Sequence, residues 1–391
     1  MAAIAAISIS SVAFALNFHP AFGGSFGPKH GERMSRSDSW NGSKFVNPQP
    51  IWQDTFGGLS RQLGSVADAS PATGYRPSAS APIGQSSDLA ITWLGHSSLI
   101  IEARAVRILI DPVWSDRVSP FSWIGPRRYF PVGKELRPTD VDLVLISHDH
   151  YDHLDRGTIE RLAQGNAAFV VPLGVGTHLG RWGIPGGRIR ELDWWESFRT
   201  DRIRITATPA RHGAGRVSPF ANKTLWAGFA IEVAGRKIWY SGDTGYHDDI
   251  AEIGRRLGPF DVTMIEAGQY DRTWPDWHLG PEQAVAAHEA VGGERLLPVH
   301  WGGFTLAHHG WTEPAERILA AARCRQVRLL LPMPGERIGL GDAGKSGRWW
   351  PKAVWRDAST DPIRSTLDGD DAKRYSSLPC GKGVRPRSAE S

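Results

Sequence analysis

The sequence predicts an α/β protein in which two β-sheets pack together and helices cover the outside. Short apolar runs rich in β-branched residues recur between residues 88 and 340, as expected for buried strands. The first runs are joined by tight turns, which indicates antiparallel hairpins. The later runs alternate with stretches of helical pattern, so we expect these residues to form one folded domain.

The expected elements are short, and most of the strands are apolar along their whole length. Strands are expected at residues 90–94, 99–102, 106–110, 141–146, 167–171, 188–192, 202–207, 225–233, 237–240, 262–266, 295–299 and 326–331. Helices are expected near 155–162, 281–290 and 314–322. The aromatic, Pro-broken loop 113–131 either packs on the domain or forms a wall of a substrate groove.

Segments of different composition flank this domain. Residues 1–87 form an apolar N-terminal segment and an arm rich in Gly, Pro and Ser, and residues 341–391 form a polar tail that we expect to be disordered. Residues 1–16 carry no Lys or Arg, unlike a good signal peptide, and a membrane span needs roughly 20 residues. This segment is an export signal or membrane anchor, or else a disordered or surface-packed tail. The protein is accordingly membrane-associated or exported in the first case and cytoplasmic in the second.

The most informative stretch is residues 147–153, Ser-His-Asp-His-Tyr-Asp-His, which follows the expected strand 141–146. Imidazoles and carboxylates packed this closely can gather around a borderline or hard divalent metal. His148 and His150 can point to one side, as alternating side chains of a strand do. Asp152 and His153 follow after a turn of the loop and can reach a second metal nearby.

Three further polar residues directly follow later strands. His212 lies beyond strand 202–207, Asp243 beyond 237–240, and His300 beyond 295–299. Each is flanked by Gly or Pro, which lets the backbone approach a crowded centre. Any one alone is more often structural, but together, at equivalent strand ends, they point to one metal site.

Composition excludes some classes of function. The formal net charge of +4 over 391 residues is small and no Lys/Arg-dense patch is evident, so nucleic acid is not expected as a partner. Cys324 and Cys380 lie outside the histidine stretch, which leaves His and Asp as ligands and excludes a disulfide framework. Most of the 17 Trp residues are expected to pack in the core, although some suit an amphipathic ligand.

The order of these residues, His-x-His-x-Asp-His and then His, Asp and His, resembles that of the metallo-β-lactamase superfamily. Further motifs are similar to those of one branch, the N-acyl-phosphatidylethanolamine-hydrolysing phospholipase D family and its bacterial relatives. They include Asp111-Pro112, Gly125-Pro126-Arg127-Arg128, Val171-Pro172-Leu173-Gly174, Ser241-Gly242-Asp243-Thr244-Gly245-Tyr246 and His300-Trp301-Gly302-Gly303-Phe304. The resemblance implies the metallo-β-lactamase fold for residues 88–340, a four-layer αββα sandwich of two mixed sheets with outer helices.

The resemblance also implies a role for each site residue. One Zn²⁺ would be held by His148, His150 and His212, and a second by Asp152, His153 and His300, with Asp243 bridging the two. His278 is a candidate for proton transfer or for support of the ligands, its alternative being a surface histidine before a helix. Asp149 and Asp155 would shape the loop or hydrogen-bond the ligand imidazoles. Trp123 and Ile124 lie where the family contacts acyl chains.

The expected activity is that of a zinc-dependent, phospholipase D-like phosphodiesterase, with metal-bound hydroxide attacking N-acyl-phosphatidylethanolamine or a related phospholipid. The ligands alone leave open the hydrolysis of another ester, a lactone or an amide. A nuclease is disfavoured by the charge distribution. An inactive, metal-dependent binding module is the alternative that is not an enzyme. Expected partners are a phospholipid or other small phosphodiester, a membrane surface contacted peripherally, and a second copy in a homodimer.

Overall fold

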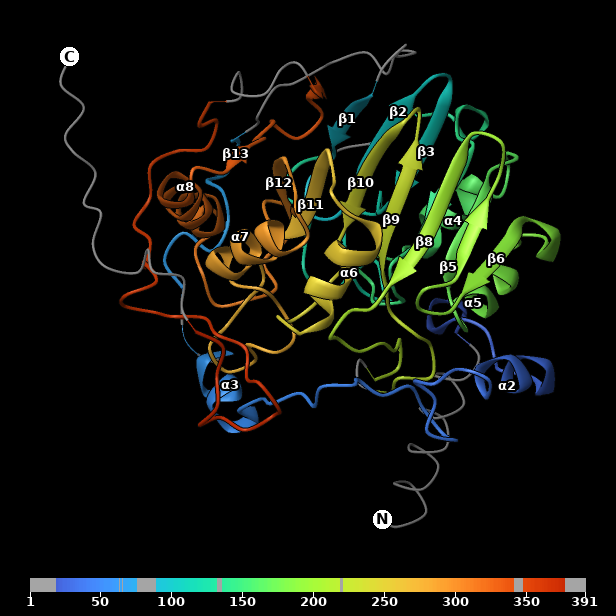
Figure 1. Cartoon of the computed structure of the whole chain (residues 1–391), viewed down its shortest axis with the longest axis horizontal. Helices are drawn as coiled ribbons and strands as arrows, with labels where there is room; N and C mark the ends of the chain where they lie inside the picture. The colour runs from blue at the N-terminus through green and yellow to red at the C-terminus, as the bar shows by residue number, and fades with distance from the viewer. Residues whose placement is uncertain are drawn as a thin grey trace.

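The computed structural model describes residues 19–62, 64, 66–75, 89–131, 136–218, 221–340 and 347–376. In this part of the chain, two seven-stranded sheets pack face to face (Figure 1). The first sheet has the spatial order β14 (Arg337–Gly339), β1 (Ala90–Trp93), β2 (Leu99–Ala103), β3 (Val106–Ile110), β4 (Leu143–Leu145), β5 (Ala168–Pro172) and β6 (Ile189–Leu192). The second has the order β13 (Arg328–Leu329), β12 (Arg295–Val299), β11 (Val262–Glu266), β10 (Arg236–Tyr240), β9 (Gly228–Val233), β8 (Ile203–Thr208) and β7 (Ser197–Arg199).

Each sheet is antiparallel on one side and parallel on the other. In the first sheet, β14, β1, β2 and β3 pair antiparallel, whereas β3 to β6 run parallel. In the second, β7 to β10 pair antiparallel and β10 to β13 run parallel. Antiparallel neighbours need only a tight turn, whereas parallel neighbours need a crossover, usually a helix. The expected mixture of early hairpins and later strand–helix alternation is therefore confirmed.

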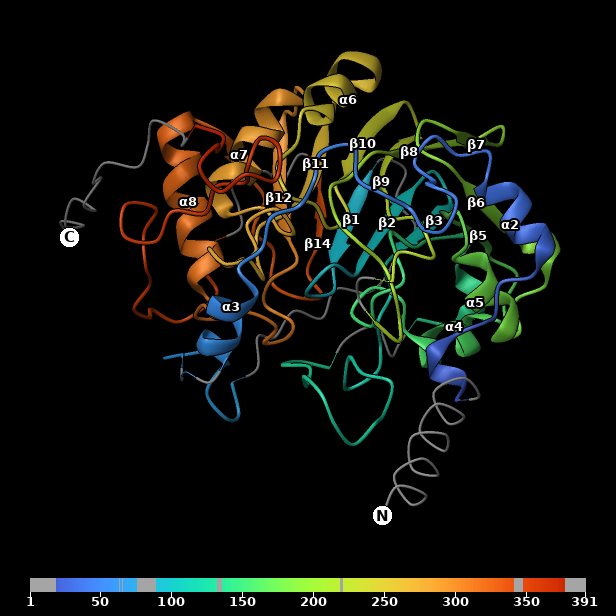
Figure 2. The same cartoon turned by 90° about the horizontal axis from the view of Figure 1, so that it is seen from below.

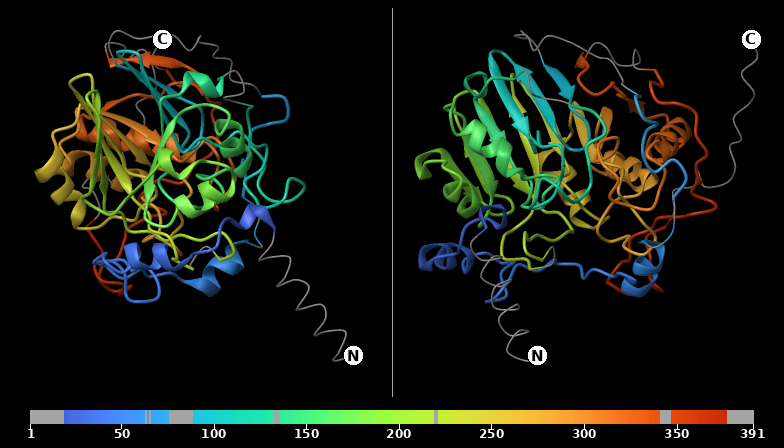
Figure 3. Two further views of the ribbon diagram at one scale, coloured as in Figure 1. Left: turned by 90° about the vertical axis from the view of Figure 1, so that its right-hand side faces the viewer. Right: turned by 180° about the vertical axis from the view of Figure 1, so that it is seen from behind.

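Helices cover the outer faces of both sheets (Figures 2 and 3). The first sheet is covered by α4 (Arg156–Leu162) and α5 (Gly176–Arg181), and the second by α6 (Asp249–Leu257), α7 (Pro281–Ala290) and α8 (Glu313–Arg325). The predicted αββα sandwich is confirmed. The N-terminal arm carries α2 (Pro28–Met34) and α3 (Thr55–Gln62), and short 3₁₀ turns lie at Pro20–Phe22, Pro138–Asp140 and Gly186–Arg188.

The central strands are buried on both faces, which explains why their sequences are largely apolar. Ile108 and Ile110 of β3 belong to the core between the sheets, whereas Leu109 belongs to the layer beneath α4 and α5. Side chains alternate between the faces of a strand, so a central strand of a four-layer sandwich needs apolar residues at every position.

The sequence prediction does not contain α2 and α3 of the arm, nor α5, α6, β7 or β14. The strands β7 and β14 have three residues each, too few for a periodic pattern. Helix α5, Gly-Thr-His-Leu-Gly-Arg, includes two glycines, which are poor helix formers. By contrast, α6 has acidic residues in its first turn, arginines in its last and a buried Ile250 and Ile253. The sequence therefore contained enough signal to predict α6.

Residues 347–376 do not form the disordered tail that the sequence predicts for residues 341–391. Trp350, Ile363 and Thr366 in this segment are buried. The Thr366 hydroxyl donates a hydrogen bond to Oδ2 of Asp276 at 2.6 Å. Polar composition was misleading here because a few side chains of the segment find buried partners on the domain. Residues 377–391 lie outside the described residues.

The expectation of a membrane-associated or exported protein is not supported and is corrected. Within the described residues, no helix combines the length and the apolar character needed to cross a membrane. Residues 1–16, on which that expectation rested, lie outside the described residues.

Candidate metal centre

The residues predicted as metal ligands lie at the ends of strands from both sheets. The loop 147–153 follows β4 of the first sheet, while His212, Asp243 and His300 follow β8, β10 and β12 of the second. Their donor atoms form overlapping groups in which all atoms lie within 4.8 Å of one another. The packing of the two sheets therefore brings together residues that span positions 148 to 300.

The first donor set consists of His148, His150 and His212. The Nε2 atom of His148 lies 2.9 Å from Nδ1 of His150, and Nε2 of His212 lies 3.3 Å from the same atom. Three imidazole nitrogens that face one another this closely surround a point that each of them could coordinate.

The second donor set consists of Asp152, His153 and His300. Oδ2 of Asp152 lies 3.4 Å from the Nε2 atoms of both His153 and His300. Asp243 stands between the sets: its Oδ2 is 3.0 Å from His153 Nε2 and 3.1 Å from His300 Nε2. The same oxygen is 3.8 Å from Nε2 of both His148 and His212.

Hydrogen bonds on the far side of the rings set the tautomers of the ligand histidines. Nδ1 of His153 donates to Oδ2 of Asp111 at 2.7 Å. The Ser147 hydroxyl donates to the same Asp111 oxygen at 2.5 Å and is therefore free to accept from Nδ1 of His148 at 3.0 Å. With the proton on Nδ1, the Nε2 lone pair of both rings faces the centre.

The other two rings contact backbone carbonyls, and one of them also contacts a carboxylate. Nδ1 of His212 donates to the carbonyl of Trp277 at 3.0 Å, whereas Nδ1 of His300 lies 3.3 Å from the carbonyl of Gly268 and 3.2 Å from Oε2 of Glu266. The side chain of Asn47 in the N-terminal arm makes two hydrogen bonds to the backbone of His212. It accepts from the N–H at 3.0 Å and donates to the carbonyl at 2.7 Å. The arm thus helps to position a candidate ligand of the domain.

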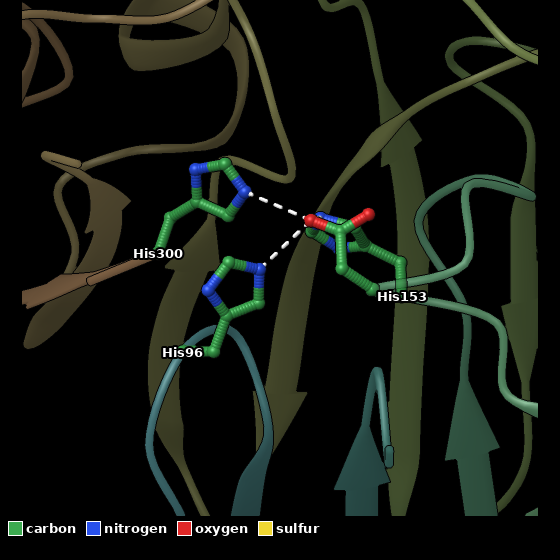
Figure 4. Close-up of side chains that lie close together, drawn as sticks. His96, His153 and His300 are labelled. Atoms are coloured by element: carbon green, nitrogen blue, oxygen red, sulfur yellow. Dashed lines mark hydrogen bonds and ion pairs between the residues drawn. The ribbon is translucent and has the colours of Figure 1, made fainter. Parts of the chain in front are cut away.

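His96 is a further neighbour of the second set. It lies in the turn between β1 and β2, and its Nε2 donates to Oδ2 of Asp152 at 2.8 Å. Figure 4 shows His96 and His300 converging on one carboxylate oxygen. The backbone carbonyl of His96 also accepts from the N–H of His300 at 2.9 Å. These contacts give His96 a structural, hydrogen-bonding role beside the second donor set.

Burial and charge give the histidines different protonation preferences. Burial lowers the pKa of His148 and of His212 well below 6.5, which leaves neutral rings with free lone pairs. Burial acts the same way on His153 and His300, but the Asp243 carboxylate and its neighbours raise the pKa of His153 well above 6.5 and that of His300 to about 10. Carboxylates that draw protons to this point also favour a cation.

Two buried carboxylates contact the site in ways that the sequence did not predict. Asp111, which the sequence offered only as part of a motif, follows β3 and contacts Ser147 and His153, as described above. Glu266 ends β11, is fully buried, and has its Oε2 2.8 Å from Nδ1 of His278. Both directly follow or end an apolar strand, the same signal that identified Asp243.

Asp149 and Asp155 shape the histidine loop, which is the first of the two roles predicted for them. Oδ1 of Asp149 accepts from the N–H of Gly215 at 2.6 Å, and its Oδ2 lies 3.1 Å from Nε2 of His178. Burial raises the pKa of Asp149, but the hydrogen bond and charge of His178 outweigh it and lower the value to about 2. Asp155 caps α4 by accepting from the N–H of Thr158 at 3.1 Å.

A cavity of about 250 Å³ opens onto the donor atoms. His278 lines it, together with indole, amide and apolar side chains from Gln53, Gln269, Trp274, Trp277 and Leu306. Trp123 and Ile124 are not among its described lining residues. Trp123 is 73% exposed and stacks on Phe121 at a ring distance of 5.8 Å, and Ile124 is 50% exposed.

The donor atoms themselves indicate that the centre is built for cations. Nε2 of His153 and Oδ1 of Asp243 are buried, yet neither has a hydrogen-bond partner among the described residues. A buried polar atom without a partner is costly, and lone pairs aimed at one another repel unless a proton or a cation lies between them. Imidazole and carboxylate donors in this arrangement fit divalent metal ions.

Comparison with known proteins agrees with this geometry. Residues 106–301 match the family model described as a beta-lactamase superfamily domain. The chain belongs to the beta-lactamase superfamily. Among structures of this fold, a possible metal-dependent hydrolase from Veillonella parvula superposes with a TM-score of 0.51 at 17% identity, over 64% of this chain and 98% of its own. The predicted metallo-β-lactamase fold is confirmed.

Some curated relatives within this superfamily have higher sequence identity to the chain. An uncharacterized protein of Mycobacterium tuberculosis is 42% identical over 81% of this chain and 88% of its own length. The N-acyl-phosphatidylethanolamine-hydrolyzing phospholipase D 1 of Caenorhabditis elegans is 35% identical over 59% of this chain and 69% of its own length. The protein is thus a metal-dependent hydrolase of the beta-lactamase superfamily.

Proposed function

We propose that this protein is a dinuclear zinc-dependent hydrolase of the phospholipase D type, acting on N-acyl-phosphatidylethanolamine or a related phospholipid. The observation that carries the proposal is the position of Asp243. Its Oδ2 lies between 3.0 and 3.8 Å from imidazole nitrogens of both donor sets. A carboxylate shared in this way is suited to bridging two cations.

Each residue of the centre then has a role. His148, His150 and His212 would hold one zinc ion, Asp152, His153 and His300 the other, and Asp243 both. Bound zinc supplies Lewis acidity and a water molecule of lowered pKa. Asp111, Ser147 and the carbonyls of Trp277 and Gly268 keep the ligand rings in the tautomer that coordination requires.

His278 is the proposed proton donor. In a phospholipase D reaction, water adds to phosphorus and the bond from phosphorus to the head-group oxygen breaks, so that oxygen must take up a proton. The ring of His278 lines the cavity, and its Nδ1 is engaged by Glu266 at 2.8 Å, which leaves Nε2 for a substrate atom. The hydrogen bond to the Glu266 carboxylate orients the ring, and a positioned imidazole is the most common general acid.

The size of the cavity supports a head group rather than a whole lipid. About 250 Å³ is less than most ligand pockets provide, since these span roughly 300–1,000 Å³. Acyl chains would then lie outside the cavity, and the exposed Trp123 and Ile124 remain our proposed contacts for them. Phospholipid substrates are favoured further by the names of the relatives from Caenorhabditis elegans and Saccharomyces cerevisiae, both N-acyl-phosphatidylethanolamine-hydrolyzing phospholipases D.

A direct assay tests the proposal. Zinc-loaded protein should release phosphatidic acid and an N-acylethanolamine from N-acyl-phosphatidylethanolamine, with both products identified by mass spectrometry. Release of a free fatty acid instead, or turnover of lactones and amides alone, would favour the other hydrolases of this fold. Full zinc occupancy without turnover of any of these substrates would favour a binding module. The Asp243→Asn variant, measured in parallel, controls for contaminating activity.

A further inference from the structure

A second cavity, of about 400 Å³, lies beside the metal centre. It is formed by three segments that are far apart in the sequence: the arm around α3, the loop 271–273, and the C-terminal segment 362–374, which passes beside α3 in Figure 1. The two cavities are lined by neighbouring residues of the same segments. Gln53 and Trp274 line the metal-centre cavity, whereas the adjacent Trp52 and Thr273 line this one.

The walls of this second cavity are rich in guanidinium groups. Arg61, Arg272, Arg364 and Arg374 line it, together with the carboxylates of Asp54 and Asp371. Both carboxylates are engaged by neighbours: Oδ1 of Asp54 accepts from the N–H of Gly57 at 2.8 Å, and Asp371 pairs with Arg374. The lining therefore carries more positive than negative charge.

The four arginines differ in whether a carboxylate of the protein already pairs with them. Nε of Arg61 lies 3.0 Å from Oδ2 of Asp271, and Arg374 pairs with Asp371. The guanidinium groups of Arg272 and Arg364, in contrast, have no acceptor among the described residues. Each guanidinium offers donors in a planar fork that matches the oxygens of a phosphate group.

Neighbouring contacts hold the walls in place without a ligand. The N–H of Asp54 donates to the carbonyl of Thr273 at 2.7 Å, which joins the arm to the loop. Asp271 accepts from the N–H of Thr273 at 2.9 Å and stabilises the turn that presents Arg272. The guanidinium of Arg374 lies 4.9 Å from the ring centroid of Trp52, which joins the C-terminal segment to the arm.

We propose that this cavity, which we call the Arg272–Arg364 pocket, binds a phosphate group. An anion is favoured because Arg272 and Arg364, which have no acceptor among the described residues, line a preformed pocket whose carboxylates are already engaged. The phosphate is either a second phosphate on the substrate, next to the one being cleaved, or a free inorganic phosphate. A second phosphate on the substrate requires that the protein hydrolyses a phosphodiester, as proposed above. The existence of the anion site does not depend on that proposal.

Calorimetric titration of the zinc-loaded protein with inorganic phosphate tests the pocket. We expect two binding steps, one at the metal centre and one at the pocket. Replacing both arginines (Arg272→Gln and Arg364→Gln) should weaken the pocket step by about tenfold or more, since hydrogen bonds to charged groups are strong, and should leave the other step unchanged. The control Arg328→Gln, which removes an exposed arginine paired with Glu294 at 3.2 Å, should retain both steps.

A single binding step in the wild type, or an unchanged titration in the double variant, would overturn the proposal. Because neither side chain has a partner among the described residues, we expect the double variant to fold, which thermal unfolding checks. The single variant Arg364→Glu provides a second measure, in which repulsion should abolish the pocket step. Retention of that step in Arg364→Glu would also count against the pocket.

Two soluble probes distinguish the source of the phosphate, and neither requires turnover. If the pocket serves the substrate, inositol 1,4-bisphosphate should bind about tenfold or more tighter than inositol 1-phosphate by engaging both cavities. That advantage should vanish in the double variant. If the pocket serves free phosphate, the two probes should bind alike, and inorganic phosphate should fill the pocket alone. A failed hydrolysis assay would leave these binding results intact, so the two proposals fail independently.

Discussion

The Nδ1 atom of His153 lies 2.7 Å from Oδ2 of Asp111, and both side chains are completely buried. The same Asp111 carboxylate accepts from the Ser147 hydroxyl and, at 2.6 Å, from the hydroxyl of Tyr240. It therefore links the histidine loop after β4 to β10 of the other sheet. A carboxylate behind a ligand imidazole fixes the orientation of the ring and raises its basicity.

We expect Asp111→Asn to weaken zinc binding by roughly 10- to 100-fold, the usual effect of removing such a partner. The amide keeps the size of the side chain but loses its charge and one acceptor oxygen. Competition with a chelator of known affinity measures the change. Asp261→Asn is the matched control, because Asp261 accepts from the N–H of Lys237 at 2.8 Å, at the start of β10, away from the ligands. Equal effects of the two substitutions would contradict this role.

Asp243→Asn should lower the zinc content from about two ions per chain towards one and abolish turnover, because a bridging carboxylate serves both cations. Elemental analysis of dialysed protein measures the first effect and the lipid assay the second. The fold should persist, since the substitution preserves the size of the side chain, and far-UV circular dichroism checks this. A variant that keeps both ions and full activity would remove Asp243 from the bridging position.

His278→Ala should reduce kcat by about 10² or more, the usual contribution of a general acid, with little change in KM. Glu266→Gln should also reduce kcat, by a smaller factor, because it weakens the hydrogen bond that orients the ring of His278 but leaves the ring itself present. A leaving group of low pKa, such as p-nitrophenol, needs little protonation, so both variants should recover much of their activity on p-nitrophenyl phosphodiesters. Loss of activity that is equal on both kinds of substrate would contradict a role as acid.

The double variant Trp123→Ser and Ile124→Ser should raise KM for a long-chain lipid and leave hydrolysis of bis(p-nitrophenyl) phosphate unchanged. The reason is that both side chains are largely exposed and neither lines the cavity next to the donor atoms. Steady-state kinetics measures kcat and KM for each of the two substrates and shows whether only the lipid is affected. Were both substrates affected alike, the loop would be acting on the centre itself and not on the acyl chains.

Thr366→Val should cost about 1–3 kcal/mol of unfolding free energy, because it removes a buried hydrogen bond to a carboxylate and leaves the N–H of Gly369, which donates to the Thr366 hydroxyl at 3.0 Å, without its acceptor. The Thr366 hydroxyl donates to Oδ2 of Asp276, the oxygen that also pairs with Arg211 at 2.8 Å. Denaturant titration measures the loss. Thr360→Val, on the exposed part of the same segment, should stay within about 0.5 kcal/mol of the wild type. Equal stability of the two variants would mean that the C-terminal segment contributes little.

Prediction from sequence was most reliable where a local pattern carried the information. Three elements have the bounds expected from their hydrophobic runs and the Gly and Pro residues around them: the strand Val262–Glu266, the helix Pro281–Ala290 and the strand Arg295–Val299. Elements without such a pattern, such as β7 and β14, exist because neighbouring strands offer them hydrogen bonds. Their formation depends on tertiary contacts that no short window of sequence contains.

The candidate site divides in the same way. The spacing of His148, His150, Asp152 and His153 was sufficient to indicate a metal-binding loop, because ligands close in sequence are necessarily close in space. Glu266 and the supporting role of Asp111 were not evident, since an acidic residue at a strand end has no marked signature until its partner is known. Asn47 shows the same limit, because its contact with His212 spans an arm and a domain that are distant in the chain.

By itself, the order of residues determined that this chain would form layered strands and helices with a cluster of nitrogen and oxygen donors. Those features follow from local periodicity and short-range spacing. Only the tertiary structure decided that the C-terminal segment packs on the domain, that Asn47 of the arm contacts His212, and that Arg272 and Arg364 share a pocket. Each of these depends on which distant segments come into contact, and that choice is made by the burial of the whole core.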